Sequence, residues 1–349
     1  MAERIFEKGS LVIRAESAAS DEMVSLIGRT VWGSGNTRYR INDAREKLAL
    51  LNGSQFITSR IGRCLVGVYV LRPKRVAIGE NTYPAFYRTY LAVDPEHSGR
   101  GYGALLVEKA REHYREKLGG AGLLYGYIEA DNSSSLRVSQ LAGYESIATF
   151  ETAVFSRLRP REHVGLRRLE VREKTAAVTD LEALYAGHNF RDFGQSLDVE
   201  RYFILEDDKG IAAGVQVETC DWVIKRLAGV SGFLLVHLVW RTPVLRRLFD
   251  ARRCRFLKLG NLYARLGAEA SLFALMESVL SHHRVGSAMI LHDPRSPVFR
   301  RLERSGAFGF LNSGVNATVH VMAEKSRLIL ADEQHLKDHP IVISPLDIG

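Results

Sequence analysis

The sequence has few cysteines. Cys64, Cys220 and Cys254 are the only three in 349 residues, and they lie far apart. No pair has the spacing of a redox motif or of a metal-ligand pair, and their number is odd. A disulfide scaffold and a zinc ribbon are therefore disfavoured. No metal site is predicted, because the adjacent His282 and His283 would point apart on a helix end without a well-spaced third ligand.

The sequence also lacks a long apolar run. None approaches the roughly 18 residues that a membrane-spanning helix needs. The N-terminal MAERIFEKGS carries charges where a signal peptide needs an apolar core. A hydrophobic content of 46% and a mean hydropathy of −0.09 are ordinary globular values, which exclude disorder. We therefore predict a cytoplasmic protein.

Length and charge set further bounds. A chain of 349 residues is long for one domain, so two domains are expected. The net charge of +8 and the pI of about 9.4 suit an anionic partner: nucleic acid, a lipid surface or a phosphorylated cofactor. Charge alone does not choose among these partners.

Helical and strand patterns alternate along the first half, which predicts an α/β (α+β) fold with a mixed central sheet flanked by helices. The predicted strands are Leu11–Arg14, Gln55–Ser59, Cys64–Leu71, Phe86–Val93 and Leu123–Ala130, and the predicted helices are Asp21–Arg29, Ile41–Leu51, Gly103–Lys117 and Ser134–Leu141.

The second half repeats this order weakly, at an offset of roughly 160 residues. The echoes are the strand Leu169–Arg172, the helix Thr179–His188, the strand Ala288–His292 and the helix Val298–Ser305. Two interpretations stay open, a duplication and a coincidence among common elements. Taking the charged stretch Arg157–Arg168 as a linker, we predict domains at residues 1–158 and 159–349.

The most informative stretch is LAVDPEHSGRGYGA, Leu91–Ala104. A strand ends, and Gly99, Gly101 and Gly103 lead into a helix. Glycines let backbone N–H groups converge, and a helix N-terminus adds partial positive charge, so the loop suits a pyrophosphate. It has neither the Gly-Lys-Ser/Thr of a Walker loop nor the GxGxxG spacing of a dinucleotide site.

Together with NSSSLRVSQLAGY, Asn132–Tyr144, this loop resembles the GNAT superfamily of acyl-CoA-dependent N-acyltransferases. The resemblance implies that loop amides hold the pyrophosphate of coenzyme A, that the preceding strand binds the pantetheine arm, and that an asparagine contacts the cofactor. The implied residues are Leu91, Val93, Ser98, Gly99, Arg100, Gly101, Tyr102, Gly103, Ala104 and Asn132.

The sequence departs from the family pattern in three places. Ser98 stands where the loop usually has Gln or Arg, Ser139 stands where a general-acid Tyr is usual, and the strand FYRTYLAV has no carboxylate. Glu129 and Tyr127 share a strand face, so we predict Glu129 as base through water and Tyr127 as acid. The alternative is that Tyr127 packs in the core and Glu129 pairs with a basic neighbour.

The second half lacks the glycine loop. Where the loop should fall, the sequence reads ARLGAEAS, and Glu269 would repel a phosphate. We therefore predict one coenzyme A site per chain, with the second half as a scaffold or as one wall of the acceptor cleft.

The segment Phe233–Lys258 has no counterpart in the first half. An apolar run, Phe233–Trp240, precedes a predicted helix that begins at Thr242-Pro243 and extends through Arg253. Arg246, Arg247, Arg252 and Arg253 are basic residues within it. The segment is either a core strand with a solvated helix or a patch for an anionic membrane or substrate.

The predicted activity is transfer of an acetyl or other acyl group from acetyl-CoA to a primary amine. The alternative is a non-catalytic acyl-CoA sensor. Aminoacyl transfer from charged tRNA is a third reading, which the intact loop argues against, so nucleic acid is not the expected partner. The acceptor and the oligomeric state are not encoded in any recognisable motif.

Overall fold

The computed structural model describes residues 2–33, 37–51, 53–227, 250–304, 308–309, 311–312, 317–344 and 347. Among these residues no helix is both long and apolar enough to cross a membrane.

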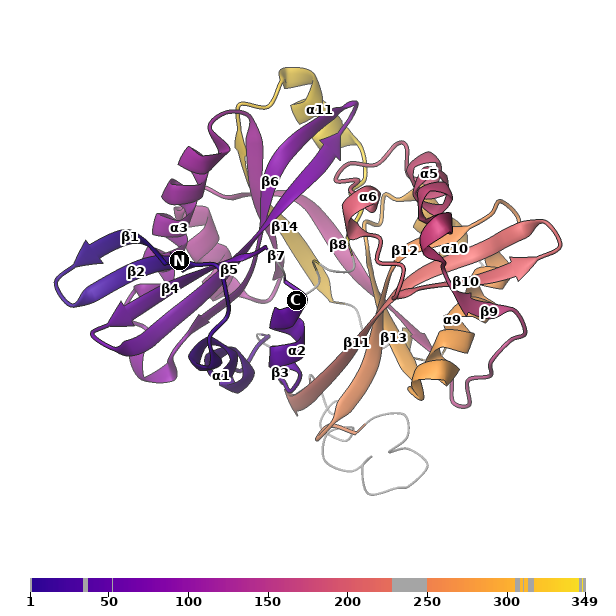
Figure 1. The fold of residues 1–349 in the computed structure, drawn as a ribbon, viewed down its shortest axis with the longest axis horizontal. Helices are drawn as coiled ribbons and strands as arrows, with labels where there is room; N and C mark the ends of the chain where they lie inside the picture. The colour runs from indigo at the N-terminus through magenta and orange to yellow at the C-terminus, as the bar shows by residue number, and fades with distance from the viewer. Residues whose placement is uncertain are drawn as a thin grey trace.

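The first half alternates strands and helices as predicted (Figure 1). Its elements are β1 (Glu3–Lys8), β2 (Leu11–Glu16), α1 (Asp21–Arg29), β3 (Arg38–Ile41), α2 (Ala44–Ala49), β4 (Gln55–Ile61), β5 (Cys64–Ile78), β6 (Asn81–Val93), α3 (Tyr102–Leu118), β7 (Gly122–Glu129), α4 (Ser133–Leu141) and β8 (Glu145–Ser156).

The second half follows a similar order. Its described elements are β9 (Leu166–Arg168), α5 (Lys174–Leu184), α6 (Phe193–Ser196), β10 (Tyr202–Asp207), β11 (Gly210–Arg226), β12 (Cys254–Ala264), α9 (Glu269–His283), β13 (Ser287–His292), α10 (Pro297–Arg304), β14 (Thr318–Ser326) and α11 (Leu330–Asp338).

All the strands belong to one mixed, 14-stranded sheet that runs through both halves (Figure 1). Its order is β1-β2-β4-β5-β6-β7-β14-β8-β13-β12-β11-β10-β9, with β3 pairing β11. The last strand of each half therefore pairs with strands of the other half. β14 of the second half lies between β7 and β8, and β8 of the first half lies between β14 and β13. The two halves interlock, and the division at residue 158 stays a prediction.

The repeat is visible in the details of pairing. Two strand pairs are parallel, β6 with β7 and β12 with β13. In each half the first strand of that pair carries a positive-φ residue, Tyr90 (φ 49°) or Asn261 (φ 48°). Each lies beside a register shift against the preceding strand, at Val68/Val70 and at Gly214/Gln216. A bulge at the same topological position in both halves supports a duplication.

Helices cover both faces of the first half's sheet. The buried residues Leu106, Val107, Ala110 and Tyr114 form one stripe of α3, which packs with α4 on one face. On the other face α1 packs against Val68, Val70 and other inward-facing strand residues. Ser20 caps α1 by accepting a hydrogen bond from the Met23 N–H at 3.4 Å.

Besides the helix expected at Thr179–His188, which is α5 and spans Lys174–Leu184, three predicted elements were placed wrongly. The strand expected at Leu169–Arg172 is β9, three residues earlier; Leu169 only donates its N–H to the Tyr202 carbonyl at 2.8 Å, and a short 3₁₀ turn follows. The helix expected from Ile41 begins at Ala44, because Ile41 pairs with Trp222 in the sheet.

The third misplaced element is the basic helix expected to reach Arg253. Residues 250–253 form a turn into β12, and Arg253 pairs with Asp221 at 2.8 Å. Lys258, within the same basic run, is 1% exposed and lies over the Trp222 ring. Phe233–Trp240, Arg246 and Arg247 lie outside the described residues.

The strand exchange gives the first prediction. A fragment of residues 1–160 would lack β14, which supplies eight paired residues to β7, whereas β6 supplies three. We expect this fragment to aggregate, because β7 and β8 would each expose an unpaired edge. Size-exclusion chromatography and far-UV circular dichroism measure this. Co-expression with residues 161–349 is the control and should restore a soluble complex; a monomeric, cooperatively unfolding fragment alone would contradict the interlocked architecture.

Candidate functional site

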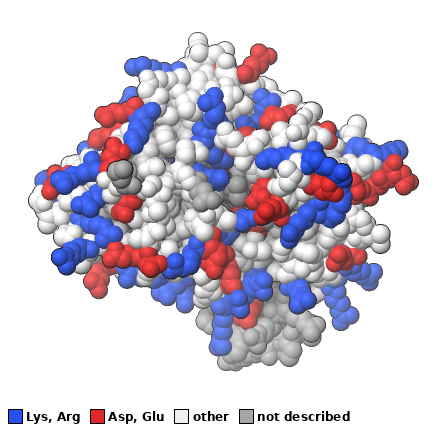
Figure 2. Space-filling model, in the orientation of Figure 1, with Lys and Arg blue, Asp and Glu red and all other residues white. Residues whose placement is uncertain are grey.

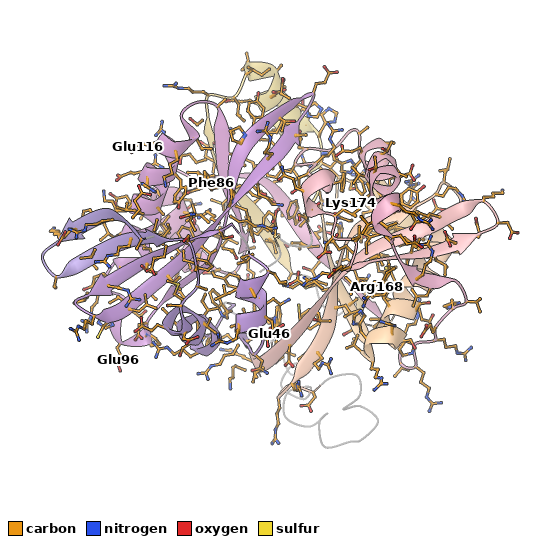
Figure 3. The ribbon with its side chains drawn as sticks, in the orientation of Figure 1. Glu46, Phe86, Glu96, Glu116, Arg168 and Lys174 are labelled. Carbon is orange, nitrogen blue, oxygen red and sulfur yellow. The ribbon has the colours of Figure 1, made fainter. Side chains whose placement is uncertain are left out.

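A parallel strand pair opens into a V at the centre of the first half. β6 and β7 pair only from Ala85–Leu123 to Tyr87–Tyr125, although β6 continues to Val93 and β7 to Glu129. The strand edges beyond Tyr87 and Tyr125 therefore face each other without ladder hydrogen bonds. Figure 3 shows β6 running from Phe86 in the interior toward the loop with Glu96 at the margin of the molecule.

The glycine loop lies at the open end of this V. After a short 3₁₀ turn at Pro95–His97, Gly99 (φ 75°) and Gly101 (φ 82°) adopt left-handed conformations, and α3 begins at Tyr102. An added Cβ would meet no atom at either glycine, so backbone conformation rather than space demands them.

The first backbone N–H groups of α3 are free to bind an anion. The helical bond from the Leu105 N–H to the Gly101 carbonyl comes first, at 3.0 Å, so the amides of residues 102–104 precede it. Ser98, Gly99, Arg100, Gly101 and Ala104 are exposed, and Tyr102 and Gly103 are half-buried. The loop thus has the exposure and the backbone geometry of the predicted pyrophosphate site.

The other predicted cofactor residues lie around the same V. Leu91 and Val93 are half-buried on the splayed part of β6. Asn132 follows β7 at the same edge of the sheet, because β6 and β7 are parallel. Its side chain caps α4 by accepting from the Ser135 N–H at 3.1 Å, which leaves its amide NH₂ free of that role.

Tyr127 and Glu129 share one face of β7, as predicted. Tyr127 packs among aromatic rings, with centroids 5.3 Å from both Tyr87 and Phe150. Burial, and then the charge of Asp347, hold the pKa of Tyr127 well above its ordinary value. Glu129 is half-buried, opposite Val319 of β14. The aromatic packing is the structural alternative for Tyr127, and it coexists with a position on the V.

Sequence reasoning missed a buried cation at the apex of the V. Arg88 of β6 is 7% exposed, and its Nη1 donates to Ser139 Oγ at 2.9 Å and to Tyr69 Oη at 3.2 Å. Its guanidinium carbon lies 3.8 Å from the centroid of the Tyr144 ring. The only available signal was a lone Arg in the apolar strand FYRTYLAV.

A second buried charge cluster lies on the Tyr127 face and was also missed. Lys74 Nζ pairs with Asp192, and lies 3.3 Å from Asp347 Oδ1. Tyr125 Oη donates to Asp347 Oδ2 at 3.0 Å, and Tyr87 Oη donates to the Asp347 carbonyl. Burial raises the pKa of the Asp347 carboxyl, while the Lys74 charge acts against this shift. The cluster ties the C-terminal segment to β5, β6 and β7.

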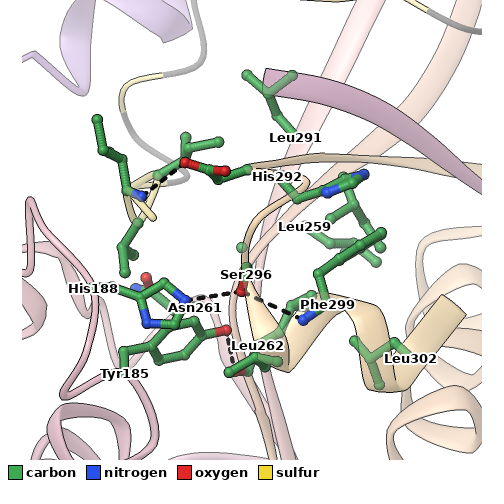
Figure 4. Close-up of a pocket in the computed structure, with 17 residues that line it drawn as sticks. Tyr185, His188, Leu259, Asn261, Leu262, Leu291, His292, Ser296, Phe299 and Leu302 are labelled. Carbon is green, nitrogen blue, oxygen red and sulfur yellow. Dashed lines mark hydrogen bonds between the residues drawn. The ribbon is translucent and has the colours of Figure 1, made fainter. Parts of the chain in front are cut away.

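The second half contains the equivalent V, and side chains of the same half line the small pocket at this position (Figure 4). The β12–β13 pairing ends at Leu259–Ile290, and Tyr185 Oη donates to the Leu262 carbonyl of the splayed strand at 2.9 Å. A cavity of about 50 Å³ remains, room for a few waters at most. Its lining includes Tyr185, His188, Leu259, Asn261, Leu262, His292, Ser296, Phe299 and residues 341–343.

The second half's loop region differs correspondingly. Gly267 (φ 81°) is the one positive-φ glycine there, and α9 begins at Glu269 without a side-chain cap. An acid in the first turn opposes anion binding. Within the described residues no group of three His, Cys, Asp or Glu side chains could hold a metal ion.

Surface charge is mixed. Figure 2 shows basic and acidic side chains interspersed over the face it presents, so the net charge of +8 is not gathered there into one basic patch.

A splayed parallel strand pair, a β-bulge and a glycine loop opening a helix define the fold class of acyl-CoA-dependent N-acyltransferases. Comparison with known proteins agrees. The model of the Acetyltransferase (GNAT) family matches residues 27–144. Residues 27–144 therefore match a domain of the GNAT family.

Solved structures extend the fold similarity over both halves. Saccharomyces cerevisiae N-myristoyltransferase with bound myristoyl-CoA covers 92% of this chain and 84% of its own, with a TM-score of 0.59 and 9% identity. A GCN5-related N-acetyltransferase from Kribbella flavida covers 90% and 71%, with a TM-score of 0.50 and 16% identity. No curated protein matches the sequence.

The V of the second half gives a prediction about pH. Burial lowers the pKa of His188 and of His292 from 6.5 to about 4. Between these values the unfolded chain binds protons that the folded chain does not, so stability is full above pH 6.5 and is lost as the pH falls toward 4. Each histidine contributes on the order of 3 kcal/mol to this loss.

Urea denaturation from pH 7 to pH 4.5 measures the effect. The His188→Gln, His292→Gln double variant should show a shallower decline in unfolding free energy over this range than the wild type. Equal slopes for the two proteins would show that these histidines are not buried in neutral form.

Proposed function

We propose that this protein is an N-acyltransferase that moves an acetyl or other acyl group from acyl-CoA to a primary amine. The observation that carries the proposal is the glycine loop at the open end of the β6–β7 V, with the α3 amides at its base. This geometry suits a pyrophosphate followed by an extended arm that pairs with a strand edge.

The proposed donor site uses the predicted residues. Ser98–Ala104 hold the pyrophosphate through backbone amides, Leu91 and Val93 on β6 accompany the pantetheine arm, and Asn132 contacts the cofactor from the end of β7. The second half is proposed to bind no coenzyme A, because Tyr185 and the segment around Ile341 take the place of the arm there.

The proposed chemistry is direct attack of the amine on the thioester carbonyl. Glu129 receives the ammonium proton through water. Tyr127 keeps its proton at neutral pH because of its raised pKa, so it serves as a hydrogen-bond donor, and full proton transfer to a thiolate of pKa about 8.5 is uphill. Backbone N–H groups of the splayed β6 stabilise the oxyanion.

The acyl chain and the acceptor are the open parts of the proposal. Acetyl is the simplest donor group, and the fold shared with a myristoyl-CoA-bound yeast enzyme makes a longer chain the next one to test. The acceptor is a primary amine of unassigned class. The enzyme itself is proposed to be cytoplasmic.

A non-catalytic acyl-CoA sensor is the second candidate. The Ser139 hydroxyl, at the usual general-acid position, accepts a hydrogen bond from Arg88 at 2.9 Å, and a serine hydroxyl is far too weak an acid to protonate a thiolate. Release of free thiol from acetyl-CoA, octanoyl-CoA or myristoyl-CoA, with and without a panel of amines, separates the two. If the protein binds acyl-CoA but no amine increases thiol release from any of the three donors, the result would favour the sensor.

The loop gives a prediction about binding. Isothermal titration with coenzyme A should give one site per chain. Gly101→Glu should weaken binding at least a hundredfold, because a carboxylate would face the pyrophosphate. Gly101→Ala is the control, since it brings the same positive-φ strain without charge and should lose much less. Two equivalent sites per chain, or equal losses in both variants, would contradict the assignment.

Asn132 gives a second prediction, which separates its role as the cap of α4 from its proposed contact with coenzyme A. Asn132→Ala should lower the unfolding free energy by about 1 kcal/mol through the lost cap and weaken coenzyme A binding. Asn132→Ser restores the cap but not the amide NH₂. If the amide contacts the cofactor, Asn132→Ser should recover stability and still bind about tenfold more weakly. Full recovery of both would leave Asn132 with the capping role alone.

A further inference from the structure

Arg88 is a buried cation with unused hydrogen-bond donors. Its Nη1 is bonded, but Nε and Nη2 are buried without a partner. The groups that touch its guanidinium are the neutral hydroxyls of Tyr69 and Ser139 and the ring of Tyr144. Among the ion pairs of the described residues none includes Arg88.

A buried guanidinium destabilises the folded protein unless an anion binds to it. Two buried donors without acceptors add to this destabilisation. The packing nevertheless holds Arg88 in place, with a ring on one side and two hydroxyls at Nη1. The remaining donors are preorganised for a ligand that carries negative charge.

Sequence and register place these donors at the apex of the V. Tyr87 and Tyr125 are the last paired residues, so Arg88 and Gly126 are the first residues of the splay. A Cβ at Gly126 would lie 2.5 Å from the Arg88 Cγ and 3.1 Å from its Nε. The glycine leaves the space through which the Arg88 side chain crosses β7 to reach Ser139 on α4.

The length of the proposed donor matches this position. From its phosphate oxygen to its sulfur a pantetheine arm has about twelve chain atoms, the length of roughly four extended residues. Starting beside Val93 and the glycine loop, an arm running along β6 ends near Thr89 and Arg88. The sulfur would therefore reach the apex of the V, where the Arg88 Nε lies beside Gly126.

We propose that Arg88 binds the thiolate of coenzyme A as the acyl group leaves, a role that rests on the proposed function. The amine forms a C–N bond to the carbonyl carbon, and the C–S bond breaks with both electrons on sulfur. Before the attack the acceptor ammonium loses one proton through water to Glu129, and the nitrogen loses its second proton to solvent as the tetrahedral adduct collapses to the amide. Arg88 keeps its own proton, and solvent later protonates the thiolate. A fixed cation thereby replaces a proton-donating side chain at Ser139.

The test uses coenzyme A itself and needs no acceptor. The pKa of the bound coenzyme A thiol is measured from its thiolate absorbance during a pH titration of the complex with the full-length protein. In the wild type it should lie about one unit or more below the ordinary thiol value of about 8.5, which is a tenfold or greater preference for thiolate. Binding of desulfo-coenzyme A, which lacks the thiol, is measured in parallel.

Variants then assign the shift. Arg88→Met, of similar length without charge, should return the bound thiol to its ordinary pKa while binding desulfo-coenzyme A within about threefold of the wild type. Arg88→Lys should retain part of the shift. Arg111→Met is the matched control. Arg111 lies on α3 and pairs with Glu324 of β14 at 2.9 Å, so this variant should leave the thiol pKa shift unchanged.

The outcomes separate the two proposals. If neither coenzyme A nor desulfo-coenzyme A binds the wild type, the proposed function fails. If both bind and the wild-type thiol has an ordinary pKa, the role of Arg88 is overturned, a result that requires no variant to fold. A shift that survives in Arg88→Met also overturns it.

Discussion

The pairing of β7 with β14 is the constraint on which the site depends. A V between β6 and β7 requires β7 to leave β6 after three residue pairs, so another strand must hold it. In this chain that strand comes from the end of the second half and pairs along all of β7. The opening in one half is therefore stabilised by the other half. Burying β7 on its second edge also removes an exposed edge from the middle of the molecule.

The two halves show how a repeated fold gives unequal sites. Both keep a parallel strand pair and a positive-φ bulge, which are backbone features that any sequence with the right pairing reproduces. They differ in what occupies the splay. The first half has glycines that present amides at its mouth, whereas in the second the Tyr185 hydroxyl donates to the Leu262 carbonyl of the splayed strand. The Leu262 carbonyl is therefore satisfied within the chain, which supports the proposal that the second half binds no coenzyme A.

Contiguous patterns predicted the first half well. The five predicted strands, the glycine loop and the shared face of Tyr127 and Glu129 follow from local periodicity and turn chemistry, and the structure contains them, whereas β1, β3 and β8 were not predicted. Errors arose where tertiary contacts outweighed local signals. The sequence pattern predicted a helix start at Ile41, but Ile41 pairs with Trp222 of β11 as part of a strand. Lys258 reads as part of a solvated basic run, but it is buried beside Trp222.

The missed residues share a physical reason. Arg88 meets Ser139 across 51 positions and Asp347 meets Tyr125 across 222, so no spacing rule connects either pair. Only the fold brings them together. A buried charge in a sequence looks the same as an exposed one until its neighbours are known.

These buried charges lie on opposite faces of one strand pair. Arg88 points toward α3 and α4, the side of the loop amides, so groups of positive character lie on the face that is proposed to hold the anionic cofactor. Glu129 and Asp347 lie on the other face, where Asp347 is held by Lys74 and Tyr125 and Glu129 is the group proposed to receive the ammonium proton. In acyl transfer to an amine, protons leave the acceptor nitrogen while negative charge develops on the leaving sulfur. A sheet that keeps acceptors of protons on one face and a fixed cation on the other separates those two charges without requiring any side chain to relay a proton between them.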